Sequence, residues 1–352
     1  MKRLISTFMA AFAVLTVTAS IVPAQQVGAQ SSASLSIVPK KTYTVEPGKS
    51  VKDKLTIRNM DKEIPLELNL RVIDFTFTDD GGTPKLMLNE DAPQTKWSLK
   101  PYLTVPKTVK IEPGKSKTVD MSVAIPANRG AGSLYSAIVY SSGASDGGNV
   151  GLSASGVTLV FASIPGTVSQ DLTVEKFGAY NLAVGDRKAS YTSLTTTQPK
   201  NIAYTLKNKG NVTEAPTGTI TLKGTFGKEI TIANINPNES LALIDQTRTF
   251  VSCIKLKAQD VDFNGTKTES KQCAEPGLWP GYYKATLNLV YGQNGNATKE
   301  ATSIAGFWYL PWWFVIIVLV LFGAIAIAIT LLVRKFRGKN HTTKRKKLLR
   351  RK

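Results

Sequence analysis

Apolar and polar residues alternate along most of the chain between about residue 31 and residue 307. In 66–72, 119–125 and 220–223, apolar residues recur at every second position. A period of two is typical of a β-strand with one face in a core and the other in water. Each such stretch is short and is followed by Gly, Pro, Asn or Asp, which favour turns. The pattern predicts an all-β ectodomain built from short strands.

The length of this ectodomain predicts two domains, because one immunoglobulin-sized β-sandwich takes roughly 100 residues. We expect the boundary at the Ile-Pro-Gly-Thr stretch 164–167, which follows a Gly- and Ser-rich loop and the apolar run 157–161. The first immunoglobulin-like domain is then expected over 31–166 and the second over 167–307.

Both ends of the chain replace this alternation with continuous apolar runs. Residues 1–30 combine Lys2 and Arg3, an apolar stretch and small residues suited to a signal peptidase, which is the pattern of a cleaved signal peptide. An uncleaved anchor is the alternative, and two cleavage sites stay open. The run 314–333 is uncharged and matches the thickness of a bilayer. We expect a transmembrane helix over 308–334.

Aromatic residues precede this run and basic residues follow it, which predicts its direction. Aromatic rings mark the membrane interfaces, and Lys and Arg gather on the cytoplasmic side. The sequence therefore predicts a single-pass type I protein of the cell membrane, with an extracellular ectodomain and a cytoplasmic tail over 335–352. The expected fold class is all-β, two tandem immunoglobulin-like β-sandwich domains plus one C-terminal transmembrane α-helix. The expected membrane-interface residues are Trp308, Tyr309, Trp312, Trp313, Arg334 and Lys335.

The net charge of +19 is mainly a property of the tail. Residues 334–352 carry eleven of the 44 Lys and Arg residues and no acidic residue. Such a cluster binds an anionic inner leaflet with about 1 kcal/mol per basic residue near the surface. A basic run can also bind nucleic acid. Because a membrane span adjoins this one, we expect lipid contact and no nucleic-acid partner.

The chain has two cysteines, Cys253 and Cys273, and both are expected outside the cell. An oxidising compartment permits a disulfide between them, which would contribute roughly 3 kcal/mol to stability. Two free or metal-bound thiols are the alternative, although two sulfurs without a nearby His supply only half of a zinc site. We predict the disulfide and no metal site.

Candidate catalytic groups are scarce in the ectodomain. The single histidine, His341, lies in the tail, which removes Ser-His-Asp, Cys-His and His-zinc arrangements from the ectodomain. The sequence has no Walker loop and no dinucleotide fingerprint. Ser-Lys dyads and carboxylate pairs stay formally open. We expect a protein that is not an enzyme and has no cofactor.

Two kinds of turn are predicted between the strands. The sequence of 45–50 recurs in 111–116 and, more loosely, in 235–240. Pro followed by Gly suits the centre of a type II turn, where the second residue has a positive φ. A hairpin turn is predicted over 79–82, an Asp-Asp-Gly-Gly stretch flanked by Phe75 and Phe77.

An ordered series of motifs runs through both predicted domains. The first domain has Trp97-Ser98-Leu99, the Pro-Gly turn in 111–116, a strand ending in Ile125-Pro126, and Gly132-Ser133-Leu134-Tyr135-Ser136-Ala137-Ile138. The later part has Asn208-Lys209-Gly210-Asn211, then Gly281-Tyr282-Tyr283, then Phe307 to Trp312. The series resembles the WxL-interacting proteins of Gram-positive bacterial surfaces over most of residues 35–335. We expect Trp97 to lie in the core of its domain, and Tyr135 and Tyr282 to be inward-facing or corner residues of their strands.

The resemblance implies a first domain associated with peptidoglycan and a second associated with host or partner proteins. The cysteine-bearing segment 253–273 departs from the family pattern, so the second domain's partner stays open. The expected function is a non-enzymatic adaptor that contacts cell wall or other surface proteins, with edge strands available to recruit partner segments. An adhesin toward another cell, with its affinity in the second domain, is one alternative. An accessory subunit of a membrane complex, dependent on the helix and tail, is the other.

Overall fold

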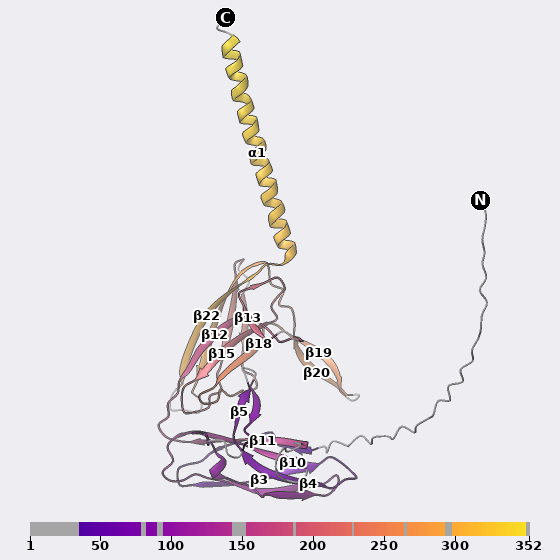
Figure 1. Ribbon diagram of the computed structural model, residues 1–352, viewed down its shortest axis with the longest axis vertical. Helices are drawn as coiled ribbons and strands as arrows, with labels where there is room; N and C mark the ends of the chain where they lie inside the picture. Colours follow the sequence, from indigo (N-terminus) through magenta and orange to yellow (C-terminus); the bar gives the residue numbers. More distant parts are fainter. Residues whose placement is uncertain are drawn as a thin grey trace, which may run out of the picture.

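A computed structural model shows two β-sandwiches in tandem and one long C-terminal helix, which confirms the expected fold class (Figure 1). The expected signal peptide and the turn residues Asp79 and Asp80 lie outside the described residues. The structure describes residues 35–78, 82–89, 94–142, 153–185, 188–226, 229–263, 266–292 and 298–349.

The first sandwich packs a four-stranded sheet, β1-β3-β9-β7, against a five-stranded sheet, β2-β11-β10-β4-β8. The alternating residues of 66–72 and 119–125 form strands whose inner faces are buried in one apolar core with residues such as Leu55 and Ile138. The bounds are β1 (Leu35–Ile37), β2 (Lys40–Thr44), β3 (Ser50–Asn59), β4 (Leu66–Ile73), β7 (Leu103–Thr104), β8 (Thr108–Ile111), β9 (Ser116–Ala124), β10 (Gly132–Ser142) and β11 (Ser153–Ile164), with a short 3₁₀ helix at Lys100–Tyr102.

A separate hairpin leaves the first sandwich and reaches toward the second (Figure 1). Its strands are β5 (Phe75–Thr78) and β6 (Thr83–Leu86), which pair in antiparallel from Phe75 opposite Leu86 to Thr78 opposite Thr83. This pairing confirms the hairpin that the sequence predicts around 79–82.

The second sandwich packs sheet β13-β12-β15-β18 against sheet β14-β22-β21-β16-β17. Its core contains Tyr204, Leu222, Leu287 and Phe307. The chain enters it after β11, through residues 165–171. The bounds are β12 (Leu172–Asn181), β13 (Ser190–Thr192), β14 (Leu194–Thr195), β15 (Asn201–Asn208), β16 (Thr217–Gly224), β17 (Glu229–Ala233), β18 (Thr247–Cys253), β21 (Gly281–Tyr291) and β22 (Lys299–Tyr309).

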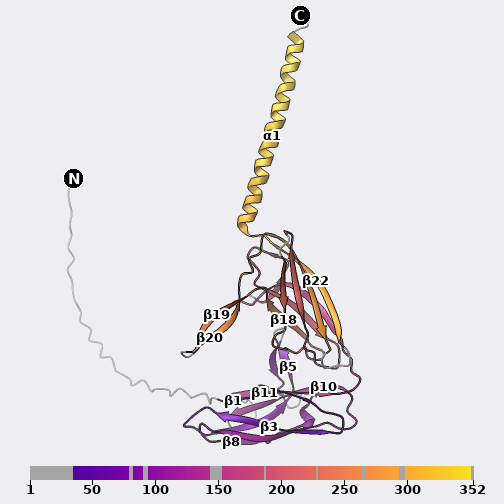
Figure 2. The same cartoon turned by 180° about the vertical axis from the view of Figure 1, so that it is seen from behind.

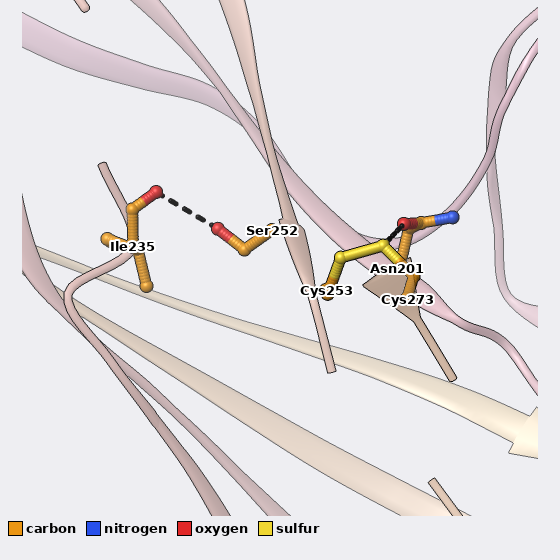
Figure 3. Close-up of a disulfide and its surroundings, with 5 residues drawn as sticks. All are labelled: Asn201, Ile235, Ser252, Cys253 and Cys273. Carbon is orange, nitrogen blue, oxygen red and sulfur yellow. Dashed lines mark hydrogen bonds between the residues drawn. A yellow bond between two sulfur atoms is a disulfide. The ribbon is translucent and has the colours of Figure 1, made fainter. Parts of the chain in front are cut away.

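The cysteine-bearing segment forms a two-stranded ribbon, β19 (Leu256–Phe263) and β20 (Thr266–Cys273), that stands away from the second sandwich (Figures 1 and 2). The predicted disulfide is present, and Cys253 at the end of β18 is joined to Cys273 at the end of β20 (Figure 3). The two Cα atoms lie 5.1 Å apart. Because an isolated hairpin is marginally stable in water, the disulfide stabilises the base of the ribbon.

The recurring Pro-Gly motif forms turns between strands, as predicted. Gly48 and Gly114 have φ of +78° and +65°, and the N–H groups of Lys49 and Lys115 close the two turns. The third copy differs, because its positive φ, +48°, falls on Glu239, one residue after the position equivalent to Gly48. Asn238 stands at the glycine position of this copy, and the N–H of Glu239 closes the turn on the carbonyl of Asn236.

The C-terminal helix, α1 (Trp312–Leu349), contains a segment, Trp312–Lys335, that is long and apolar enough to cross a membrane. The expected start at residue 308 is wrong. Strand β22 continues to Tyr309 because Trp308 and Tyr309 pair with Tyr282 and Gly281 of β21. Proline has no N–H and a fixed φ, so the strand gives way to the helix at Pro311.

The alternation along β22 also corrects two side-chain expectations. Tyr309 is 6 % exposed and belongs to the second core, so its expected place at the membrane interface is wrong. Trp308, one residue earlier, points to the opposite face and is 48 % exposed. Tyr282 lies opposite Trp308 on that outer face and is 40 % exposed, so the inward-facing alternative for it is wrong.

Candidate functional site at the domain junction

Strand β10 is buried on both of its faces. Residues 132–140 are all buried, although alternate side chains of a strand point in opposite directions. Leu134 and Ile138 enter the core of the first sandwich. Tyr135 and Val139 belong to a separate cluster on the other face. The outer face of β10 is therefore the surface on which the two sandwiches meet.

The second cluster, called here the junction cluster, joins the two domains through apolar contact. The Tyr135 ring lies 5.3 Å from that of Phe75 and 5.8 Å from that of Phe161. Aromatic pairs at such distances contribute about 0.5–1.5 kcal/mol beyond their buried area. Burial raises the pKa of the Tyr135 hydroxyl, so it stays neutral. The buried members are Ile73, Phe75, Tyr135, Ala137, Val139 and Phe161 of the first domain with Leu243 and Ile244 of the second.

Backbone hydrogen bonds tie the start of β10 to the loop after β15. The N–H of Ser133 donates to the carbonyl of Asn211 at 2.9 Å, and the N–H of Thr213 donates to Ser133 Oγ at 3.0 Å. Asn211 Nδ2 donates to the carbonyl of Ala131 at 3.1 Å. Gly132 has a φ of +143°, and a Cβ there would lie 2.7 Å from the Asn211 carbonyl. Only glycine allows this close approach of the two segments around Gly132 and Asn211.

The β5–β6 hairpin forms the other side of the junction. The N–H of Phe77 donates to Gln246 Oε1 at 3.0 Å. The Arg248 guanidinium lies 4.6 Å from the centre of the Phe77 ring and 5.2 Å from that of Phe250. Arg248 Nη1 also donates to the carbonyl of Leu241 at 2.6 Å. A cation between two rings from different domains holds the hairpin against the second sandwich.

Trp97 is held beside β10 by backbone and side-chain contacts. The N–H of Tyr135 donates to the carbonyl of Trp97 at 2.9 Å, and the two rings stack with centres 6.1 Å apart. The neighbouring Ser98 donates its hydroxyl to buried Asp74 at 2.7 Å, and Ser136 donates to the same carboxylate oxygen at 3.0 Å. Trp97 is only partly buried and packs against the junction cluster, so the expectation of a fully internal side chain holds in part.

A cleft of about 550 Å³ opens between the two sandwiches beside this cluster. Arg129 Nη2 donates to the carbonyl of Lys96 at 2.7 Å. Within the described part of the chain, Arg129 Nε and Trp97 Nε1 are buried N–H groups that donate no hydrogen bond to the protein. The lining of this junction cleft includes Lys96, Trp97, Arg129, Lys209, Asn211 and Asp245.

The charge and donors of the junction cleft suit an anionic ligand. Three cations, Lys96, Arg129 and Lys209, face the single carboxylate of Asp245. Two buried N–H groups on residues of the lining have unused donor capacity. Hydrogen bonds from charged donors to an anion are about twice as strong as neutral ones. The arrangement can bind and orient a carboxylate or phosphate group.

The sequence motifs that are far apart along the chain meet at this site. Trp97, Tyr135 and Asn211 come from three separate motifs and are brought into contact around the start of β10. Sequence reasoning did not identify Lys96 and Arg129 as residues of the site. It also did not identify Leu243 and Ile244 as buried members of the junction cluster. The described residues contain no group of three or more His, Cys, Asp or Glu side chains that could hold a metal ion.

No protein-family model matches the chain, and no curated protein matches it. Among solved structures, it is similar to the class 5 fimbriae chaperone CfaA, at 12% identity and a TM-score of 0.34 over 78% of this chain and 100% of that one. It is also similar to the Escherichia coli chaperone DraB, at 13% identity and a TM-score of 0.30 over 76% and 98%. The Pseudomonas aeruginosa CupB2 chaperone matches at 8% identity and a TM-score of 0.29 over 75% and 96%.

Proposed function

We propose that this chain is a membrane-anchored, non-enzymatic adaptor of the bacterial cell surface. It binds the cell wall, peptidoglycan in particular, through an anionic group held in the junction cleft. The observation that carries the proposal is the set of three cations, Lys96, Arg129 and Lys209, which line that cleft with a single carboxylate, Asp245. Peptide stems of peptidoglycan end in carboxylates, and wall polymers carry phosphates, so both present the required chemistry.

The junction supports a binding role because it joins the two sandwiches into one unit. A ligand in the junction cleft contacts both domains, since Lys96 and Arg129 belong to the first and Lys209 and Asp245 to the second. The apolar cluster and the hydrogen bonds around Asn211 preorganise these groups, which lowers the entropic cost of binding.

The helix supports anchoring to a membrane and the direction in which it crosses. Its apolar segment, Trp312–Lys335, follows the second sandwich after two residues. The basic residues after it favour a cytoplasmic tail at an anionic inner leaflet, with the ectodomain outside. The same topology suits other surface proteins as partners of the second domain.

The proposal is tested with a soluble ectodomain, residues 31–310, in two pull-downs. One uses purified cell-wall sacculi and the other uses detergent-solubilised surface proteins. We expect the ectodomain to sediment with sacculi, and its bound fraction to fall as salt is raised, because solvent-exposed charges are screened.

The outcomes separate the three functions. Binding to neither sacculi nor surface proteins, while the full chain co-purifies with a membrane complex, would contradict the adaptor and favour an accessory subunit. Binding only to whole cells of another type would favour an adhesin.

A further inference from the structure

Large aromatic side chains gather in exposed positions at one end of the second sandwich. Trp279 is 63 % exposed and Phe226 is 72 % exposed, and both lie in loops. Tyr282 and Trp308 are exposed neighbours on β21 and β22, with ring centres 5.3 Å apart. Soluble surfaces seldom gather large apolar side chains in this way without a partner. These four residues are called here the aromatic rim.

The strand register places all four residues at the same end of the sandwich. The start of β21 pairs with the end of β22, as Tyr282 lies opposite Trp308. Strand β16 ends beside them, since Gly224 lies opposite Tyr283, and Phe226 follows two residues later. Trp279 comes directly before β21, and its N–H donates to the Tyr283 hydroxyl at 2.9 Å.

The backbone around the aromatic rim holds its side chains outward. The N–H and hydroxyl of Thr225 both donate to the carbonyl of Tyr282, at 2.9 and 2.8 Å. Phe226 lies beside Gly281, where a Cβ would be 3.5 Å from its ring. A Cβ at Gly306 would overlap the Tyr282 hydroxyl, so glycine there lets the tyrosine lie across β22.

The membrane-spanning helix begins at this end of the sandwich. Only Leu310 and Pro311 separate the last residue of β22 from Trp312, the first of α1. The N–H of Leu310 donates to the carbonyl of Thr195 at 2.9 Å, which keeps this link on the sandwich. An extended chain covers at most about 3.6 Å per residue, so Trp308 of the aromatic rim, four residues before Trp312, lies within roughly 14 Å of the helix start.

We propose that the aromatic rim is a lipid-binding surface that lies in the headgroup layer of the outer leaflet. The proposal rests on the membrane anchoring in the proposed function. Tryptophan and tyrosine rings prefer this layer, with their apolar parts toward the acyl chains. The ectodomain is then attached to the bilayer by a surface as well as by the helix, which fixes the orientation of the second sandwich.

A pair of lysines supports a phospholipid headgroup as the partner. Lys223 and Lys284 lie directly opposite each other on β16 and β21, and both are exposed. Lys284 is two residues from Tyr282 on the same face of the strand. Like charges placed directly opposite each other destabilise a sheet. Glu229 of β17 lies opposite Lys223 on its other side and offsets one of the two charges. Lys284, beside the aromatic rim, is then the cation for a headgroup phosphate.

The test measures tryptophan quenching by lipids brominated near the headgroup end of the acyl chains. The full chain is reconstituted in vesicles of brominated or ordinary phosphatidylcholine, alongside the variants Trp279→Phe, Trp313→Phe and Trp97→Phe. Subtracting each variant's emission from that of the unmodified chain isolates one tryptophan. Trp279 and Trp313 are exposed, so replacing them should leave the fold intact. Trp97, at the distant domain junction, is the matched control.

We expect brominated lipid to reduce the emission of Trp279 and Trp313 alike and to leave that of Trp97 unchanged. Quenching of Trp313 without quenching of Trp279 would overturn the lipid-binding surface and leave the membrane anchor intact. If neither is quenched, the anchor itself fails, and with it the proposed membrane attachment. A chain carrying both Phe226→Ser and Tyr282→Ser gives a second readout, since loss of the aromatic rim should then reduce the quenching of Trp279.

Discussion

Replacing Tyr135 by alanine is expected to lower the free energy of unfolding of the ectodomain by about 3–5 kcal/mol, the usual cost of removing a fully buried aromatic ring. Tyr135 is fully buried and contacts Phe75, Phe161 and Trp97, so no neighbouring side chain can fill the space it leaves. Because Tyr135 also belongs to the junction cluster, which contains Leu243 and Ile244 of the second domain, the loss should also uncouple the two sandwiches. Urea denaturation should then change from one transition to two.

The control variants separate the ring from its hydroxyl and from its position. Tyr135→Phe keeps the ring and removes a buried hydroxyl that makes no hydrogen bond among the described residues, so it is expected to change the free energy of unfolding by less than about 1 kcal/mol. Tyr282→Ala removes an exposed tyrosine of the second sandwich and is expected to cost about 1 kcal/mol or less. An equal cost for Tyr135→Ala and Tyr282→Ala would contradict a stabilising junction.

Ending the chain after Leu310 is expected to release the whole protein from the membrane fraction. The truncation removes α1 and leaves both sandwiches complete, since β22 ends at Tyr309. Insertion of a transmembrane helix is effectively irreversible, whereas a surface contact through a few aromatic rings is reversible. Fractionation of cells that express the truncated chain should find it in the soluble fraction or the medium.

A second truncation tests whether the apolar segment alone is sufficient. Ending the chain after Lys339 removes most of the basic tail and keeps Trp312–Lys335. We expect this chain to stay in the membrane fraction and to resist extraction at high pH. Extraction of the full-length chain by salt or alkaline carbonate would show that α1 does not span the bilayer.

The strands and the helix could be predicted from the sequence because one local signal determines each of them. Alternation of apolar and polar residues along 66–72 and 119–125 indicates strands with one buried face. An uncharged apolar run of bilayer length indicates a membrane-spanning helix. The boundary at Trp308 was missed because hydropathy is similar on both sides of it. The pairing of Trp308 and Tyr309 with the preceding strand β21 and with the distant strand β14 decides where the strand ends.

The phase of a strand is harder to predict than its existence. Tyr282 and Tyr283 are adjacent, and either could point inward, since a shift of one residue exchanges the two faces. The structure buries Tyr283 against Phe307 and exposes Tyr282. Side-chain chemistry cannot separate two tyrosines, so only the packing of the opposite strand settles the choice.

The candidate site could be predicted only in part. Residues 132–140 are apolar or small at nearly every position, and such continuity indicates a strand buried on both faces. That signal points to a covered outer face and does not identify what covers it. Lys96, Arg129 and Lys209 come from three loops with no shared spacing, so their convergence depends on how the two sandwiches meet.

The proposed adaptor function depends on the junction cleft, and one binding comparison tests that dependence. The ectodomain is co-sedimented with purified sacculi as the unmodified chain, as Arg129→Gln/Lys209→Gln, and as Lys117→Gln/Lys176→Gln. The last variant removes the same charge from exposed strand residues of both domains outside the cleft lining. Losing two charged hydrogen bonds should weaken binding at least about tenfold, and the control should bind like the unmodified chain. Equal weakening in both variants would contradict a specific site in the cleft and leave only non-specific attraction between charges.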